Sequence, residues 1–554
     1  MLTSETQTQS SLLYRRIYGT VGLTLLVGFY LLFGLTGHDP WRGDDIRYLG
    51  PIHSLLQGDW LLFPQLAGEP FLEYPPLYYW CAALLSSLTG WLLDIHEGAR
   101  LASVAFVALT VYCVARAAER LYGRPTRTPA ALLVLGCLGL VLHSHETQPL
   151  IALMATIAVV LAGVARIPET PLAGNLQAGL GCALAVLAGG LPGLLYTLPL
   201  FAIAVMTSPE CRDPRASGGL VAGLTLAVVV GGLWPLALLL DQPDLFAVWR
   251  HDQWQLIAGR DFSFDDFAKF IELLGWFMWP LWPLAFWALW RERRRLVQLR
   301  WLLPLVSAAI TLALMLFSTD HSQASVLPLV PALALLAAGG VPTLRRGAAN
   351  AFDWFAAMTF GVFAILVWIA WTAQVFAWPR GLARHIARVA PTFTLDHSVV
   401  LPTLIGIFIC ALWFLIAWFL PRKPGRGVVK WALGMTMLWC LAVTLLMPWF
   451  DHSRSYRQMG EALKKELVAY PNECVAAEPM PNSIRAMLDY HVGLRTVPFD
   501  DDARPPPCRL LLIYADRKSA EPGEIVDWEP LWVFRRGGGR QFESLHLYGV
   551  QHHG

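Results

Sequence analysis

The chain has 554 residues, of which 56% are hydrophobic and 15% charged, and its net charge is +2 at pH 7. A soluble domain usually has about 25% charged residues, so this composition excludes an ordinary soluble enzyme. The near-neutral balance of charges also gives no basis for a nucleic-acid partner.

Thirteen apolar runs separated by short polar joints predict an α-helical polytopic membrane protein. They cover residues 17–35, 101–118, 129–142, 149–165, 176–188, 194–207, 219–240, 273–290, 301–318, 325–341, 354–377, 399–420 and 430–449. The runs 129–142 and 176–188 are shorter than the roughly 17 residues that a helix needs to cross unaided. We therefore expect their outer ends, residues 143–146 and 189–192, to lie below the lipid surface in a cavity.

The basic residues predict the orientation of these runs. Residues 1–16 lack the short apolar region and small-residue cleavage site of a signal peptide, so we expect an uncleaved anchor with a cytoplasmic N-terminus. Alternating from there, twenty Lys and Arg residues fall in cytoplasmic segments and nine in outer loops. This agrees with the cytoplasmic bias of basic residues, and it places everything after residue 450 outside.

The segment 75–93 could be counted as a further span. Counting it would invert every later loop and place the basic clusters 291–295 and 422–426 outside. The charges therefore favour helices that lie in the outer interface around residues 40–93, where exposed aromatic residues are typical. The aromatic residues expected there are Tyr78, Tyr79, Trp80 and Trp91.

Residues 1–450 are thus predicted to form the membrane domain and residues 451–554 a small soluble α/β domain. Helical patterns cover 453–469 and 482–490, and strand patterns cover 508–515, 530–536 and 543–550. The domain contains two cysteines, Cys474 and Cys508. In an oxidising compartment they could form a disulfide, and the alternative is two free core thiols.

Two groups of polar residues are expected on the outer face. Asp44 and Asp45 could take a proton from an attacking hydroxyl or hold a divalent cation, although a solvated loop has the same spacing. The group His143, His145 and Glu146 has donor types that suit a metal, and the alternative is an interfacial loop whose histidines bond to the backbone. The chain has no P-loop, serine-hydrolase elbow or zincin motif, which disfavours an ATPase, a serine hydrolase and a zincin.

Three segments carry a resemblance to a known family. The run Asp44-Asp45-Ile46-Arg47-Tyr48, the block 58–80 (GDWLLFPQLAGEPFLEYPPLYYW) and residues 92–112 together resemble membrane glycosyltransferases of the GT-C superfamily. Within it they are most similar to the bacterial aminoarabinose transferases of lipid A and the protein O-mannosyltransferases. The resemblance covers the N-terminal third and extends more loosely through 325–339.

The resemblance implies transfer of a sugar from a polyprenyl-phosphate donor to a lipid, glycan or protein acceptor, with inversion, on the periplasmic face of a bacterial inner membrane. Asp44 or Asp45 would be the catalytic carboxylate, and the reaction would need no nucleotide cofactor. The residues expected to bind the donor phosphate or substrate are Arg47, Tyr48, Glu73, Tyr74 and Arg260. A divalent metal ion held by Glu73, His143, His145 and Glu146 is a second way to bind the phosphate.

The chain departs from the aminoarabinose transferases at three positions. Tyr74 replaces a lysine, Gly189-Gly190 replaces a Lys-Gly pair, and Gln148-Pro149 replaces Asp-Pro. Two expected phosphate-binding cations are therefore absent, so neither aminoarabinose nor lipid A is assigned as a substrate.

Two other classes of function were weighed against a transferase. A transporter or flippase of a polyprenyl-linked substrate should have two related halves and charges near mid-membrane, whereas here the charges gather at one face and no repeat is visible. A scaffold that only displays the outer domain would not explain carboxylates and histidines in several short outer loops. The sequence therefore favours the transferase.

Overall fold

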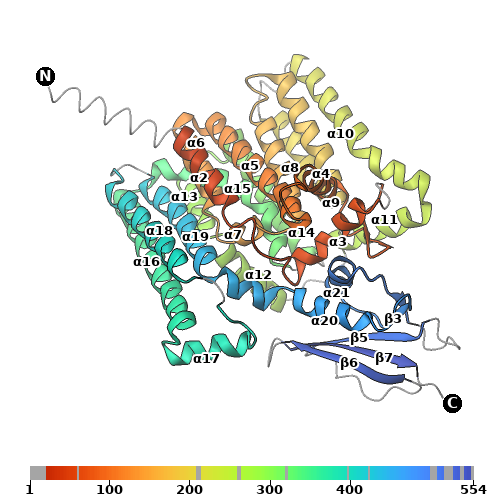
Figure 1. Cartoon of the computed structure of the whole chain (residues 1–554). Coiled ribbons are helices and arrows are strands. Elements are labelled where there is room, and N and C mark those ends of the chain that lie inside the picture. Colours follow the sequence, from red (N-terminus) through yellow and green to blue (C-terminus); the bar gives the residue numbers. More distant parts are fainter. Residues whose placement is uncertain are drawn as a thin grey trace.

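The computed structural model (Figure 1) describes residues 20–58, 62–207, 214–258, 264–318, 322–395, 398–421, 425–499, 508–516, 528–536 and 542–550. Among these residues, eight helices are long and apolar enough to cross a membrane, and the bent pair α12 and α13 adds a ninth. The chain is therefore a multi-pass membrane protein. A small α/β domain follows the last of these helices, as the sequence predicts.

The long apolar elements form the body of the molecule. They are α5 (Ile95–Tyr122), α9 (Pro171–Thr207), α10 (Pro214–Asp241), α14 (Leu299–Phe317), η3 with α15 (Gln323–Leu329 and Val330–Gly340), α16 (Arg346–Phe376), α18 (Val400–Phe419) and α19 (Arg426–Arg454). Shorter elements complete the body: α2 (Thr20–Leu32), α6 (Arg127–Leu135), α7 (Leu140–His143), α8 (Leu150–Val164), α12 (Phe264–Phe277) and α13 (Leu281–Arg291). Four more helices connect them: α3 (Asp44–Leu56), α4 (Leu77–Thr89), α11 (Pro243–Ala258) and α17 (Arg380–Val389).

The predicted apolar runs coincide with these helices, with two informative differences. Run 129–142 is divided into α6 and α7, and run 273–290 falls on α12 and α13, which meet at an angle of 94°.

Runs 176–188 and 194–207 are the two halves of α9, which reverses at Gly190, where φ is 60°. A Cβ at Gly193 would lie 2.0 Å from the carbonyl oxygen of Ala185, so the second half of α9 folds back beside the first.

The segment 75–93 contains the 13-residue helix α4, which is about 20 Å long and therefore too short to span a membrane. Trp91 is 82% exposed, as expected for an interface, but Tyr78 and Tyr79 are fully buried. The predicted interfacial placement of these two tyrosines is therefore wrong. Their rings pack in the protein core because α4 lies against α3 and α5 rather than on lipid.

The C-terminal domain has a five-stranded sheet in the order β4 (Val497–Pro498), β3 (Val475–Ala477), β5 (Leu510–Asp516), β7 (Glu543–Val550) and β6 (Trp528–Arg536). Strand β3 is parallel to β4 and β5, and β5, β7 and β6 are antiparallel. The three long strands match the predicted ones. The helical patterns contain α20 (Arg457–Leu467) and α21 (Asn482–Met487), whereas β3 and β4 are too short to give a pattern.

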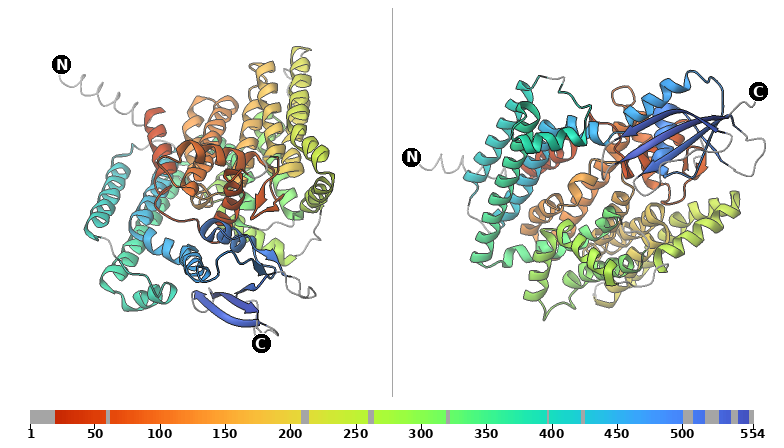
Figure 2. Two further views of the ribbon diagram at one scale, coloured as in Figure 1. Left: turned by 45° about the vertical axis from the view of Figure 1, so that its right-hand side comes forward. Right: turned by 90° about the horizontal axis from the view of Figure 1, so that it is seen from below.

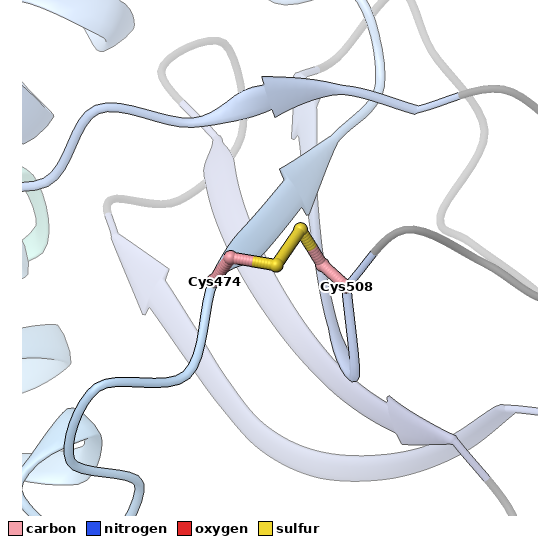
Figure 3. The surroundings of a disulfide bond; sticks show 2 residues. All are labelled: Cys474 and Cys508. Atoms are coloured by element: carbon pink, nitrogen blue, oxygen red, sulfur yellow. A yellow bond between two sulfur atoms is a disulfide. The ribbon is translucent and has the colours of Figure 1, made fainter.

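Cys474 and Cys508 form a disulfide beside strands β3 and β5 (Figure 3), with Cα atoms 5.1 Å apart. The two views in Figure 2 place this domain at the end of the body that carries α3. The hydrophobic core continues across the boundary, because it includes Ile46 of α3 and Met487 of α21. A Cβ on Gly50 of α3 would lie 3.1 Å from the Cβ of Ala486, so α3 and α21 are in close contact.

Candidate active site

The acidic pair Asp44-Asp45 forms the first turn of α3. Gly43 precedes it with φ of 96°, a conformation that glycine adopts without strain. Carboxylates in the first turn of a helix interact favourably with the positive end of its dipole. Consecutive helical residues point about 100° apart around the axis, so the two side chains have different surroundings.

Asp45 is 2% exposed and accepts three hydrogen bonds. Its Oδ2 accepts from the main-chain nitrogen of Trp41 at 3.0 Å and from Nη2 of Arg100 at 2.8 Å. Its Oδ1 accepts from the main-chain nitrogen of Thr147 at 2.7 Å. Burial by itself raises the pKa of Asp45, but the charge and hydrogen bond of Arg100 outweigh burial and lower that pKa to about 2. Asp45 is therefore a fixed negative charge that joins α3, α5 and the segment 144–149.

Arg100 belongs to the apolar helix α5 and is fully buried. Besides Asp45, it donates to the carbonyl oxygens of His38 at 3.0 Å and Asp39 at 2.8 Å. Arg100 thereby holds the loop between α2 and α3 in place. Arg100 was not among the predicted site residues, because it directly precedes the apolar run 101–118. A charged residue beside a predicted span is nevertheless a signal, since charge at membrane depth is costly.

Asp44 faces a different group of residues. Its side chain is 32% exposed, and its Oδ1 lies 3.9 Å from Nη1 of Arg47. The guanidinium of Arg47 is also ion-paired with Glu73, which accepts a hydrogen bond from the Tyr48 hydroxyl at 2.9 Å. The structure thus brings together four of the residues expected from the sequence, Asp44, Arg47, Tyr48 and Glu73, and it separates Asp45 from them.

The C-terminal domain holds the same loop from the other side. The main-chain nitrogen of Asp39 donates to Oδ1 of Asp451 at 2.9 Å, and Ser455 Oγ donates to Oδ2 of Asp39 at 2.8 Å. Arg457 is ion-paired with Asp39 as well. The loop before Asp44 is therefore fixed between α5 and the residues that open the C-terminal domain.

A cavity of about 420 Å³ begins at Arg47 and Glu73. Its walls come from the loop before α4, the first turns of α8, the reversal in α9, the end of α11, the end of α14 and η3. The lining residues are Arg47, Glu73, Tyr74, Leu150, Leu153, Gly189, Pro192, Tyr196, Leu256, Ile257, Leu314, Met315, Ser318, Ser325 and Pro328. The lining combines the charged side chains of Arg47 and Glu73 with mostly apolar residues, as expected for a site that takes an amphipathic ligand.

Two of the three departures named in the sequence analysis lie at this cavity. Tyr74 and Gly189, where the resemblance implies lysines, are both wall residues, whereas Gln148 and Pro149 are not among the residues that line the cavity. Arg47 is the described cationic side chain in the cavity wall. Gly189 and Pro192 of the segment 189–192 line this cavity, as expected, and their depth below the lipid surface stays a prediction.

The reversal in α9 is held by a residue of α11. Gln253 is 2% exposed, and its Oε1 accepts a hydrogen bond from the main-chain nitrogen of Leu191 at 3.0 Å. A Cβ at Gly190 would lie 2.0 Å from that same oxygen. Gln253 therefore fixes α11, whose next turn supplies Leu256 and Ile257 to the cavity wall. An isolated glutamine in the middle of a helix gave no sequence signal for this contact.

The expected metal ligands do not meet in one place. Both ring nitrogens of His145 face main-chain carbonyl oxygens, those of Val141 at 2.7 Å and Tyr30 at 2.8 Å. His143 Nδ1 lies 3.3 Å from Oε2 of Glu146, whereas Glu73 is engaged by Arg47. Across the described ranges, no three His, Cys, Asp or Glu residues are grouped to hold a metal ion. The proposed ligand set of Glu73, His143, His145 and Glu146 is therefore not supported by the structure.

The last expected phosphate-binding residue, Arg260, lies outside the described residues, as do Asp320 and His321 of the loop before η3. The nearest described part of its loop is α11, which ends at Ala258 and contributes to the cavity wall.

Comparison with curated proteins finds relatives that are named as arabinosyl transferases. The chain is 29% identical over 254 residues to undecaprenyl phosphate-alpha-4-amino-4-deoxy-L-arabinose arabinosyl transferase 1 of Pseudomonas fluorescens, a match that covers 43% of each chain. It is 27% identical over 250 residues to the corresponding transferase of Edwardsiella ictaluri, covering 43% of each. The matched region thus spans less than half of the length of these relatives. No family model matches the chain.

Comparison with solved structures covers nearly the whole molecule. ArnT from Cupriavidus metallidurans bound to undecaprenyl phosphate superposes with a TM-score of 0.65 at 16% identity, over 95% of this chain and 97% of that one. Its apo form gives a TM-score of 0.63 at 15% identity, over 97% and 98%. The superposition includes both the helical body and the region of the C-terminal domain. The chain therefore has the fold of the aminoarabinose transferase ArnT, which is the GT-C fold that its sequence resembles.

Proposed function

We propose that the chain is an integral-membrane glycosyltransferase that moves a sugar from a polyprenyl-phosphate donor to a hydroxyl of a lipid, glycan or protein acceptor. The observation that carries this proposal is the cavity of about 420 Å³, whose wall combines the cation Arg47 with mostly apolar residues. A polyprenyl phosphate has the matching chemistry, an anionic head on a hydrocarbon chain. The named relatives act on undecaprenyl phosphate-linked sugar, which supports the same donor class here.

The orientation is part of the proposal. The distribution of basic residues supports a cytoplasmic N-terminus and a periplasmic C-terminal domain in a bacterial inner membrane. The cavity opens beside α3, at the same end as that domain, so transfer would take place on the periplasmic face. We propose only the class of the acceptor, because Tyr74 and Gly189 stand where the resemblance implies lysines.

In the proposed reaction, the acceptor oxygen attacks the anomeric carbon while the bond from that carbon to the phosphate oxygen breaks, which inverts the configuration. The acceptor proton passes to Asp44, the carboxylate beside Arg47, and polyprenyl phosphate leaves as the anion. Arg47 stabilises the charge that develops on the leaving phosphate, and Glu73 with Tyr48 keeps its guanidinium oriented. Asp45 takes no proton because it is buried and paired with Arg100. No step is assigned to a metal ion, since the described residues do not gather a ligand set.

The test is an assay of the purified protein in detergent with undecaprenyl phosphate-linked 4-amino-4-deoxy-L-arabinose and a mixed bacterial lipid extract as acceptor. Release of undecaprenyl phosphate and formation of a glycosylated lipid are followed together by mass spectrometry. We expect release by the natural chain and its loss in Arg47→Ala. The matched control is Arg509→Ala, which removes an exposed arginine from the C-terminal domain and should leave release unchanged.

Two outcomes would overturn the proposal. One is a natural chain that binds polyprenyl-phosphate sugars but releases no polyprenyl phosphate from any of a panel of pentose and hexose donors. The other is full activity in Arg47→Ala. A donor other than aminoarabinose would leave the transferase intact and would identify the sugar.

A further inference from the structure

Helix α17 connects α16 to α18 at the end of the body that carries the C-terminal domain (Figures 1 and 2). The residues that follow it are joined to the last turn of α19. Thr392 Oγ1 lies 2.9 Å from Nε2 of His452, and the ring of Phe393 packs edge-on against that imidazole at 5.5 Å. The level of α17 relative to the C-terminal domain is therefore fixed by contacts.

The helix has one basic face. Arg380, Arg384 and Arg388 are exposed and recur at intervals of four residues, which places them on the same side. Ile386, on the opposite side, is buried. The sequence has no acidic residue between Asp353 and Asp396, and among the described residues none of the three guanidinium groups is within ion-pair distance of a carboxylate. Within the described ranges, this positive charge therefore has no carboxylate beside it.

The basic face is not explained by membrane orientation. Lys and Arg are biased toward cytoplasmic loops, yet these three make up a third of the nine basic residues in the outer loops. A feature that opposes the general bias needs another reason to be present.

The flanking helices place α17 at the level of lipid head groups. Only 17% of the apolar stretch of α16 and 11% of that of α18 is buried inside the protein, so both face lipid. Phe376 and Trp378, directly before α17, are 73% and 65% exposed. Exposed aromatic residues of this kind are typical of the membrane interface.

An apolar groove of about 440 Å³ lies below α17, between α16, α18 and α19. It is lined by Ala364, Trp368, Ile407, Cys410, Phe414 and Met437. Trp368 precedes the end of α16 by eight residues, or about 12 Å of helix, and one leaflet of the hydrocarbon core is about 15 Å thick. The groove is therefore at the depth of the acyl chains whose head groups would lie at α17.

We propose that α17 and this groove form a binding site for an anionic phospholipid, with its phosphate on the face of Arg380, Arg384 and Arg388 and an acyl chain in the groove. Charge complementarity selects the occupant, because three unpaired guanidinium groups favour a phosphate bearing a net negative charge. The site is separate from the cavity at Arg47 and does not rest on the proposed transferase activity.

The first test measures binding of phosphatidylglycerol and phosphatidylcholine to the purified full chain by native mass spectrometry. The natural chain should bind phosphatidylglycerol more tightly. The variant R380Q/R384Q/R388Q should lose that preference, because each arginine contributes about fivefold to the affinity for phosphatidylglycerol. If the triple variant does not fold, R384Q alone should bind phosphatidylglycerol about fivefold more weakly. The control K464Q/K465Q/R509Q removes three exposed positive charges from the C-terminal domain and should keep the preference. Equal affinity in the natural and arginine variants, or an equal loss in the control, would overturn the proposal.

The second test addresses the groove without changing charge. Ala364→Trp fills the groove and should weaken phosphatidylglycerol binding, whereas Val362→Trp, at a lipid-exposed position of the same helix, should not. Unchanged binding in Ala364→Trp would show that no acyl chain lies in the groove.

Discussion

Asp45 of α3 and Arg100 of α5 form an ion pair in which the side chains are 1% and 0% exposed, with Nη2 and Oδ2 2.8 Å apart. A pair buried to this degree is held by its hydrogen bonds, since both charges have lost their hydration. Here the remaining bonds go to the main chain of the loop before α3 and of the segment 144–149. The pair therefore fixes the backbone of α3, which carries Asp44 and supplies Arg47 to the cavity wall.

Asp45→Asn should destabilise the protein by about 3 to 5 kcal/mol, because it leaves the Arg100 charge buried without a partner. The measurement is unfolding of the purified variant in detergent. The double variant Asp45→Asn with Arg100→Met should recover part of that loss, since it removes both charges. If the double variant loses more free energy of unfolding than the two single variants lose together, this account of the pair is contradicted.

The same pair predicts a dependence of stability on pH. The folded-state pKa of Asp45 is about 2, below the ordinary value of about 3.9. Its contribution of about 2 to 3 kcal/mol is therefore fully present above about pH 4 and is lost as pH falls toward 2. The stability difference between the natural chain and Asp45→Asn should shrink across that window. A difference that is constant from pH 6 to pH 2 would show that the Asp45 pKa is not lowered.

Asp44→Asn should reduce sugar transfer by about 100-fold or more, the usual contribution of a general base, while the melting temperature stays unchanged. The side chain of Asp44 is 32% exposed, whereas that of Asp45 is buried in its pair with Arg100. Glu529→Gln, on exposed β6, is the matched loss of one carboxylate and should have natural activity. Full transfer by Asp44→Asn with purified donor would exclude it as the base.

Gly190→Ala should destabilise the chain and lower transfer, since the new Cβ meets Gln253 Oε1 at 2.0 Å and φ is positive. A strained backbone of this kind costs about 1 to 3 kcal/mol. The control is Gly232→Ala in α10, where a Cβ meets nothing within 4 Å. Adding Gln253→Ala should relieve the clash but not the strain. Equal melting temperatures for the two glycine variants would contradict the role of Gln253.

Replacing Cys474 and Cys508 by serine should lower the stability of the C-terminal domain by about 3 to 4 kcal/mol, the loop-closure value for the 34-residue separation. Reductant should lower the melting temperature of the natural chain and have no effect on the double serine variant. Cys81→Ser, at a free cysteine, is the control. Two free thiols in the protein purified without reductant would disprove the bond.

Much of the membrane fold could be predicted from the sequence, because each span is a local property of its own residues. Both halves of α9 were recognisable as separate apolar runs, and the three long strands of the C-terminal domain have a clear alternation. The separation of Tyr78 and Tyr79 from the lipid was not predictable. The two tyrosines are buried because α3 and α5 cover α4, and the sequence pattern within α4 does not indicate this contact.

The candidate site divides in the same way. Asp44, Arg47 and Glu73 could be recognised within one short stretch of sequence, but the different surroundings of Asp44 and Asp45 depend on Arg100, 55 residues further on. The described residues do not gather the proposed metal ligands, and the reason is related. Spacing shows which donor atoms are near in the chain, and it does not show that both ring nitrogens of His145 face main-chain carbonyl oxygens.

The contacts of Asp39 with Asp451, Ser455 and Arg457 also bear on when the site can form. They join positions more than 400 residues apart, so during synthesis the loop before Asp44 is made long before its partners. The first helix can be inserted and α5 can supply Arg100 early, yet the second set of hydrogen bonds must wait for residues 451–457. Completion of the site is therefore among the last events in the biogenesis of this protein, and a chain stalled in its final spans would have every cavity helix but an unanchored acidic loop.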